Sequence, residues 1–169
     1  EFFFVENFFG VAEAVGALAA GLLFTGRWKW VVATYAILLG AFLLHPLARI
    51  IPLWTLWNVY IAFLAIFPTA YFAKRLSYDK KGSRFLLPGI ALTSFVSVEL
   101  DVMVRIFMLI VLGLYQIYPI PVDLLPSIFV AGAFTTPVEA AYSVALCSIV
   151  GTPMLVALKR SRVLSFLNK

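Results

Sequence analysis

The run at residues 85–117 constrains the fold most, because it is almost wholly apolar and yet carries Glu99, Asp101 and Arg105. Apolar runs of this length indicate helices that lie in a membrane. Ionisable side chains inside a membrane are costly, and they usually face a protein interior or a polar cavity. The run therefore predicts a membrane helix whose charged residues have a structural or functional reason to be there.

The polar side chains of this run share one face of the predicted helix. Ser94, Ser97, Asp101 and Arg105 fall within roughly 80° of one another on a helical wheel. Asp101 and Arg105 have the i,i+4 spacing of an acid–base pair, whereas Glu99 lies roughly 160° from Asp101 and needs a different partner. Two interpretations stay open: the pair locks helix packing, or the stripe lines a site for a ligand or an ion.

The composition is that of an integral membrane protein. Hydrophobic residues make up 63% of the chain and charged residues 12%, whereas soluble domains are about 45–50% apolar and about 25% charged. We expect an all-α, polytopic helix bundle that forms a single transmembrane domain over residues 1–169. The net charge of +5 does not indicate nucleic-acid binding, because the cations cluster at the ends of apolar runs, where they act as topology signals.

Five apolar runs predict five transmembrane helices. We expect them at residues 8–24, 31–44, 53–73, within 85–117 and at 136–158. Within the fourth run, residues 85–91 read as an interfacial lead-in that is broken at Pro88. If a further helix precedes Glu1, the count becomes six and both ends lie in the cytoplasm.

The last helix has a recognisable start signal. Thr136 fits the N-cap, Pro137 the first helical position and Glu139 the third, which together form a capping box. The preceding residues 127–134 are too short to cross a bilayer and read as a re-entrant piece. The capping role of Glu139 is compatible with ligand binding, because a helix N-terminus beside a cavity is also a polar recognition surface.

The distribution of Lys and Arg predicts the orientation. Arg27, Lys29, the 74–84 loop and the 159–169 tail carry most of the cations, and cytoplasmic segments carry an excess of such residues. We therefore expect a multi-pass protein of the cell membrane, surrounded by the lipid bilayer, with the 74–84 loop and the C-terminus in the cytoplasm.

The sequence lacks the usual signatures of catalysis. It contains no glycine-rich phosphate loop, no metal-spaced His/Cys cluster and no nucleophile elbow. We expect neither an enzyme nor a bound cofactor or metal. Within the predicted helices, the carboxylates outnumber Arg105, which suits a proton- or cation-responsive cavity or a ligand with a positive group; they are Glu13, Glu99, Asp101 and Glu139.

Three features together resemble a known family. An early helix carries the small-residue row Ala12, Gly16 and Ala20, a pattern that lets helices approach closely. A polar-striped penultimate helix follows, and then a proline-rich loop at 118–126 leads to a last helix that begins Thr-Pro-Val-Glu and ends Lys-Arg. In this layout the chain resembles the substrate-binding S components of energy-coupling-factor (ECF) importers, which take up vitamins and metals.

The resemblance implies a membrane-embedded subunit that captures a small-molecule ligand near the outer face. It implies as partners a coupling transmembrane protein and ATPases, with the small-residue row docking on the coupling protein. By this analogy the pocket is lined by Asn58, Ser94, Ser97, Asp101, Arg105, Glu139, Tyr142 and Ser143.

A second hypothesis places the chain in a different class. In it the chain is a non-catalytic structural subunit of a larger membrane complex, since small membrane subunits bury apolar and occasional charged residues against their neighbours. Glu99, opposite the Asp101–Arg105 pair, would then contact another chain. The expected partner-docking residues are thus Ala12, Gly16, Ala20 and Glu99.

Overall fold

The computed structural model describes residues 2–78, 83–117 and 120–160, and this part of the chain is helical and contains no strand. The predicted all-helical class is therefore confirmed for the described residues. The long helices are α1 (Phe2–Phe24), α2 (Trp28–Leu44), α3 (Trp57–Tyr78), α4 (Ser83–Ile110) and α6 (Leu125–Arg160). Between them lie the 3-10 turns η1 (Pro46–Arg49), η2 (Leu53–Leu56) and η3 (Val122–Leu124), and the short helix α5 (Leu114–Ile117).

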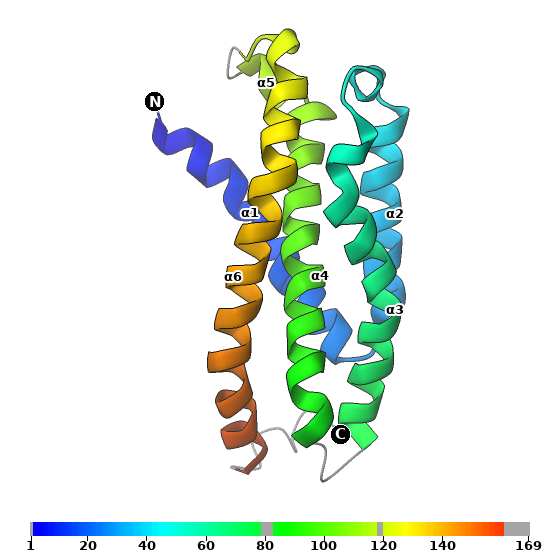
Figure 1. Cartoon of the computed structure of the whole chain (residues 1–169), viewed down its shortest axis with the longest axis vertical. Coiled ribbons are helices and arrows are strands. Elements are labelled where there is room, and N and C mark those ends of the chain that lie inside the picture. The colour runs from blue at the N-terminus through cyan, green and yellow to red at the C-terminus, as the bar shows by residue number, and fades with distance from the viewer. Residues whose placement is uncertain (1, 79–82, 118–119, 161–169) are drawn as a thin grey trace.

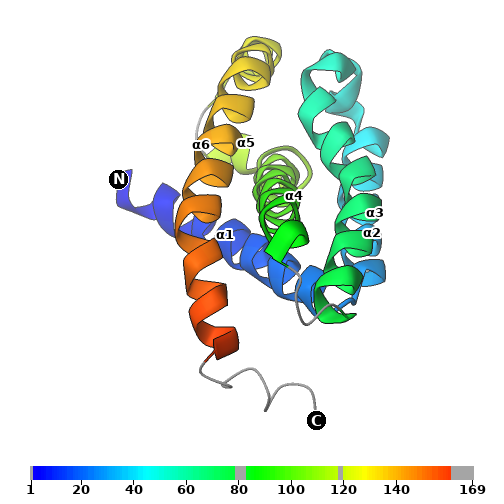
Figure 2. The same ribbon diagram turned by 60° about the horizontal axis from the view of Figure 1, so that its bottom comes forward.

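Helix α4 occupies the centre of the bundle. It contacts α1, α2, α3 and α6, and Figure 2 shows it nearly end-on with the other long helices around it. Successive long helices run in broadly opposite directions (Figure 1). A side chain on α4 can therefore meet residues from any of the other long helices.

The core is built around apolar residues of α4. Val96, Leu100 and Met103 are almost fully buried, and they belong to one hydrophobic cluster with Tyr35 of α2 and Ile66 of α3. The Tyr35 hydroxyl donates a hydrogen bond of 3.0 Å to the backbone carbonyl of Val96. Pairing this hydroxyl offsets the cost of burying it among apolar side chains.

Helices α1 and α4 pack closely through small residues. Ala12 and Gly16 are buried, and a Cβ added at Gly16 would lie 2.9 Å from the backbone oxygen of Ser97. The missing side chain of glycine is what permits this approach. The row that was expected to dock a partner protein thus packs inside the chain at Ala12 and Gly16, while Ala20 is half-buried.

The start of the last long helix differs from the prediction. Helix α6 begins at Leu125 and continues through Pro137, so the capping box at Thr136 and the separate re-entrant piece at 127–134 are both wrong. Pro137 lacks the N–H that would pair with the carbonyl of Ala133. The indole Nε1 of Trp57 donates to that carbonyl at 3.1 Å, so a residue of α3 replaces the lost bond and the helix continues.

The bounds of α4 also differ from the prediction. The helix is continuous from Ser83 and contains Pro88, so the predicted break at Pro88 is wrong. It ends at Ile110, before the end of the apolar run. Gly113 has a φ of +74°, a left-handed conformation that glycine adopts readily and that commonly ends helices.

Two of the described helical segments are long and apolar enough to cross a membrane: Leu53–Ala73 and Val122–Ala157. Two more are apolar but shorter: Gly10–Phe24 and Trp28–Leu44. The ends of α1, α3 and α6 and the start of α4 lie at one end of the bundle, and η1, η2, η3 and α5 lie at the other (Figure 1). Arg27, Lys29 and Arg75 are therefore at the first end, and Arg49 is at the second.

Candidate functional site

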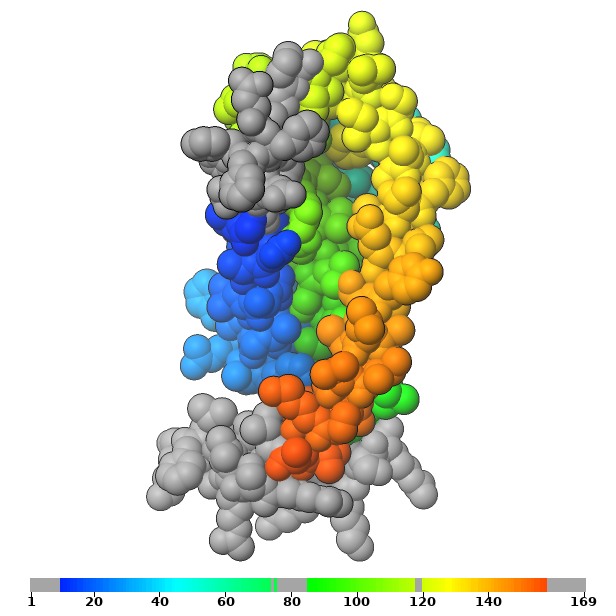
Figure 3. All heavy atoms as spheres, turned by 90° about the vertical axis from the view of Figure 1, so that its left-hand side faces the viewer, coloured from blue at the N-terminus to red at the C-terminus, as the bar shows by residue number. Residues whose placement is uncertain are grey.

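A cavity of about 470 Å³ lies between α1, α4 and α6, and η2 and the start of α3 contribute to its wall. Figure 3 shows a groove on this side of the molecule, between α1 in blue and α6 in yellow and orange, with α4 in green at its floor. Cavities that hold small organic ligands have about 300–1,000 Å³. The polar residues of the wall are Glu13, Thr55, Asn58, Asp101, Arg105, Thr136, Glu139 and Ser143.

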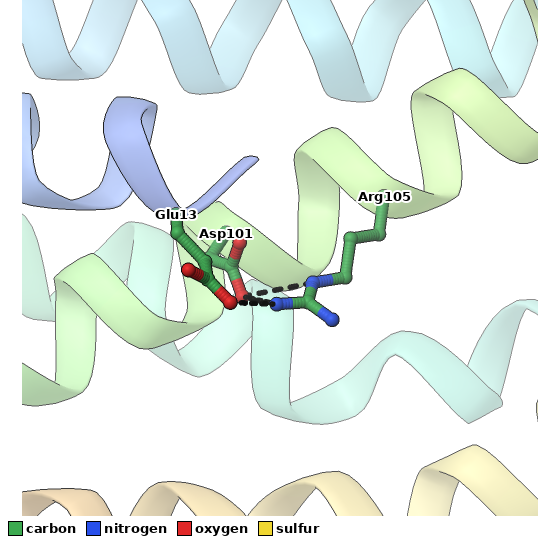
Figure 4. Close-up of polar contacts among 3 residues, drawn as sticks. All are labelled: Glu13, Asp101 and Arg105. Carbon is green, nitrogen blue, oxygen red and sulfur yellow. Dashed lines mark hydrogen bonds and ion pairs between the residues drawn. The ribbon is translucent and has the colours of Figure 1, made fainter. Parts of the chain in front are cut away.

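An ion-pair cluster joins α1 and α4 beside the cavity. Arg105 donates from Nε to Oδ2 of Asp101 at 3.0 Å, and its Nη2 lies 2.9 Å from the same oxygen. Oε1 of Glu13 lies 3.6 Å from Nη2 (Figure 4). The predicted i,i+4 pair is confirmed. The arginine side chain is 40% exposed, so the cluster remains accessible from the cavity.

Asn58 forms the centre of a second polar network. Its Nδ2 donates to Oε2 of Glu99 and to the Thr136 hydroxyl, each at 2.8 Å. The Thr136 hydroxyl in turn donates to the carbonyl of Gly132 at 2.8 Å. One amide therefore links α3, α4 and α6 and fixes the position of α6 beside the cavity.

Glu99 lies inside the bundle. Its side chain is 0% exposed, Oε2 accepts from Asn58, and Oε1 has no hydrogen-bond partner among the described residues. The predicted need for a partner other than Arg105 is met by Asn58. The expectation that Glu99 contacts another chain is wrong, because no part of its side chain reaches the surface of this chain.

The structure brings together five of the eight residues expected in the pocket: Asn58, Asp101, Arg105, Glu139 and Ser143 line the cavity. The other three lie elsewhere. The Ser97 hydroxyl donates to the carbonyl of Thr93, and the buried Ser94 hydroxyl bonds to no described residue; both serines lie outside the cavity wall. Tyr142 is 69% exposed on the outer face of α6. Helical periodicity groups residues by face, but it does not show how far along α4 and α6 the cavity extends.

Three polar wall residues were not predicted as pocket residues. Glu13 was counted among the carboxylates that suit a cavity but was not included in the predicted pocket, Thr136 was assigned to a helix cap, and Thr55 lies in the turn η2. The sequence signal for Glu13 was its position as an acidic residue within an apolar run. No such signal existed for the two threonines, because their place at the cavity depends on how the helices pack.

The wall combines charged groups with apolar side chains such as Val102, Ile106 and Phe129. Such a surface can hold a small molecule by burying its apolar part and pairing its polar part. Among the described residues, no three His, Cys, Asp or Glu side chains are grouped as metal ligands would be. No family model, no curated protein and no solved structure matches this chain. The residues of the cavity are therefore the guide to its function.

Proposed function

We propose that this chain is a membrane-embedded protein that captures a small molecule in the cavity between α1, α4 and α6. One observation carries the proposal: the cavity wall gathers Glu13, Asp101, Arg105 and Glu139, whereas the outer surface of the helices displays large apolar residues. Charged residues in a membrane domain are costly unless they serve an interior or a polar site. A shared role in binding a ligand within this cavity would explain why all four charged residues are present.

The exposed apolar surface supports insertion in a membrane. Only 6% of the apolar window in Val122–Ala157 is buried inside the chain, so α6 presents Leu146, Ile149 and Met154 outward. Soluble monomers rarely expose apolar patches of that extent. We propose that α1, α2, α3, α4 and α6 each cross the bilayer, which gives the five spans expected from the sequence.

The charges support an orientation with the cavity toward the outside. Arg27, Lys29 and Arg75 lie at the end of the bundle where α3 ends and α4 begins, and cations favour the cytoplasmic side. The cavity is lined by η2, the C-terminal half of α4 and the first half of α6, which belong to the opposite half of the bundle (Figure 1). A ligand would then enter from the outer half.

The capture role agrees with the resemblance to S components of ECF importers, in which a coupling membrane protein and ATPases supply the energy. The small-residue row does not serve as the docking surface here, because Ala12 and Gly16 are covered by α4. A coupling subunit would therefore contact another face. The alternative role as a structural subunit loses its specific support, since Glu99 is fully buried.

The proposal is tested by purifying the tagged protein from its native membranes in mild detergent and identifying bound small molecules and partners by mass spectrometry. The wild-type protein should retain a specific small molecule. Asp101→Asn should lose it by tenfold or more, because the variant removes a charge that anchors Arg105 at the wall. Asp123→Asn is the matched control, since Asp123 is exposed in η3 outside the cavity.

The readouts separate binding from folding. Size-exclusion profiles and thermal unfolding should be alike for the two variants. If no small molecule is enriched with wild-type protein, or if the Asp123 variant loses it equally, the capture role is wrong. Recovery of a membrane protein together with ATPases would support the importer assignment, and recovery of a stable assembly without a ligand would support the structural role.

A further inference from the structure

The charge at the cavity wall is unbalanced. Glu13, Asp101 and Glu139 face the cavity together with one cation, Arg105. Arg105 is already engaged by Asp101 at 2.9 Å and by Glu13 at 3.6 Å. No ion pair or hydrogen bond joins Glu139 to another residue in the described part of the chain. The wall therefore carries an excess of negative charge, and the carboxylate of Glu139 is available to bind a ligand.

The hydrogen-bond donors of the wall are largely used within the protein. Both hydroxyls that flank Asn58 donate to backbone carbonyls: Thr55 to Pro52 at 2.7 Å and Thr136 to Gly132 at 2.8 Å. The amide group of Asn58 donates to Glu99 and to Thr136. The Arg105 guanidinium is the largest donor group of the wall, and Asp101 and Glu13 already engage it. A ligand that needs donors from this wall would thus compete with bonds already made, apart from the Ser143 hydroxyl, which bonds to no described residue.

The acceptors of the wall are in contrast not fully used. Asn58 is 3% exposed and lines the cavity, and no described residue donates to its carbonyl oxygen Oδ1. This acceptor is a neutral amide oxygen and is separate from the carboxylates of the wall, and the two bonds of Nδ2 to Glu99 and Thr136 fix the amide in place. A buried acceptor without a partner is costly, and a ligand that donates a hydrogen bond would satisfy it.

The remaining wall is apolar and suits a hydrocarbon body. Val102 and Ile106 of α4 line the cavity together with Ile128 and Phe129 of α6. A hydrated metal ion gains no binding free energy from contact with such a surface. An aliphatic or aromatic group does, because it is removed from water there.

Building on the capture function proposed above, we infer that the molecule held in this cavity is an organic cation. A protonated amine or amidine group donates to Glu139 and to Oδ1 of Asn58, and an apolar body packs against the Ile106 side of the wall. The positive charge offsets the excess of carboxylates, and the N–H donors match the unused acceptors.

The test uses three probes with one body and three charges: 3-phenylpropylamine, 3-phenylpropanol and 3-phenylpropanoate. Each is titrated calorimetrically into the purified full chain in a neutral detergent, with empty micelles as the blank. The amine should bind at least about tenfold more tightly than the alcohol, and the acid should bind most weakly. The trimethylammonium analogue of the amine, which keeps the charge but has no N–H, should bind less tightly than the amine.

Variants assign the selectivity to the cavity. Glu139→Gln should reduce amine binding about tenfold while leaving the weak binding of the alcohol unchanged, because the variant removes the unpaired charge. Glu139 is exposed and makes no hydrogen bond or ion pair to another described residue, so the variant should keep the fold. Glu139→Lys should reverse the order, so that the acid binds better than the amine. Asp123→Asn should bind all probes as the wild type does.

The inference fails if the alcohol or the acid binds as tightly as the amine, if a divalent metal ion displaces the amine, or if Glu139→Gln changes nothing. These results leave the capture function standing, because that function is judged by whether a native small molecule copurifies and is lost in Asp101→Asn. Identification of a copurified neutral or anionic molecule would likewise overturn the inference while supporting capture.

Discussion

The two sides of α4 differ in how closely a neighbouring helix approaches. On the α1 side, Gly16 brings the backbones together so closely that a Cβ would lie 2.9 Å from the Ser97 oxygen. On the α6 side, the helices leave a cavity of about 470 Å³ with Asp101 and Arg105 in its wall. Gly16 permits the close approach on the α1 side, and Asp101 and Arg105 border both this interface and the cavity. One helix thus serves both as a packing surface and as the floor of a site.

The closed interface should be the more sensitive of the two to added volume. We expect Gly16→Ala to lower the free energy of unfolding by about 1–3 kcal/mol, because the new Cβ must push α1 away from the Ser97 carbonyl. Gly21→Ala is the matched control, since no atom lies within 4 Å of a Cβ there. That variant should be neutral or slightly stabilising, because alanine favours helix. Thermal and denaturant unfolding in detergent measures both.

Equal behaviour of the two alanine variants would show that α1 does not pack on α4 through Gly16. In that case the small-residue row would again be open to a partner protein, as the sequence alone suggested. A larger loss of unfolding free energy for Gly16→Ala than for Gly21→Ala would confirm that α1 and α4 pack closely at Gly16.

On the open side, polar bonds add to the packing that holds α6, whose Leu125 and Phe129 are buried in the core. We expect Trp57→Phe to lower stability by about 1 kcal/mol, because it leaves the Ala133 carbonyl without its donor. In a Pro137→Ala background the same substitution should cost less, since alanine restores the helical N–H that pairs with this carbonyl. A double-mutant cycle of unfolding free energies measures the difference.

A cycle with no coupling between Trp57 and Pro137 would contradict this account of how α6 continues through the proline. The single variants Trp57→Phe and Pro137→Ala serve as the controls of the cycle, because each changes one side of this contact alone. Ligand retention measured in the same samples reports whether the position of α6 matters to the cavity.

The sequence was enough to predict contacts within one helix, but not the contacts that depend on how the helices pack. The i,i+4 spacing was enough to predict the Asp101–Arg105 pair, since both residues lie on one helix and need no tertiary contact. Glu13 joins that pair only because α1 crosses α4 at Gly16, which no local pattern reveals. The cap predicted at Thr136 failed for the same reason: local rules do not include the indole that Trp57 supplies from α3.

The smallest expected effects come from two neighbours on α6, of which one lines the cavity and the other does not. Ser143 lines the cavity, whereas Tyr142 is 69% exposed on the outer face. Ser143→Ala should weaken retention of the copurified ligand by a few-fold, about the loss of one neutral hydrogen bond. Tyr142→Phe should leave both retention and unfolding within about 0.5 kcal/mol of wild type. If Tyr142→Phe weakened retention more than Ser143→Ala did, the ligand would have to lie on the outer face of α6, and the open side of α4 would not be the binding site.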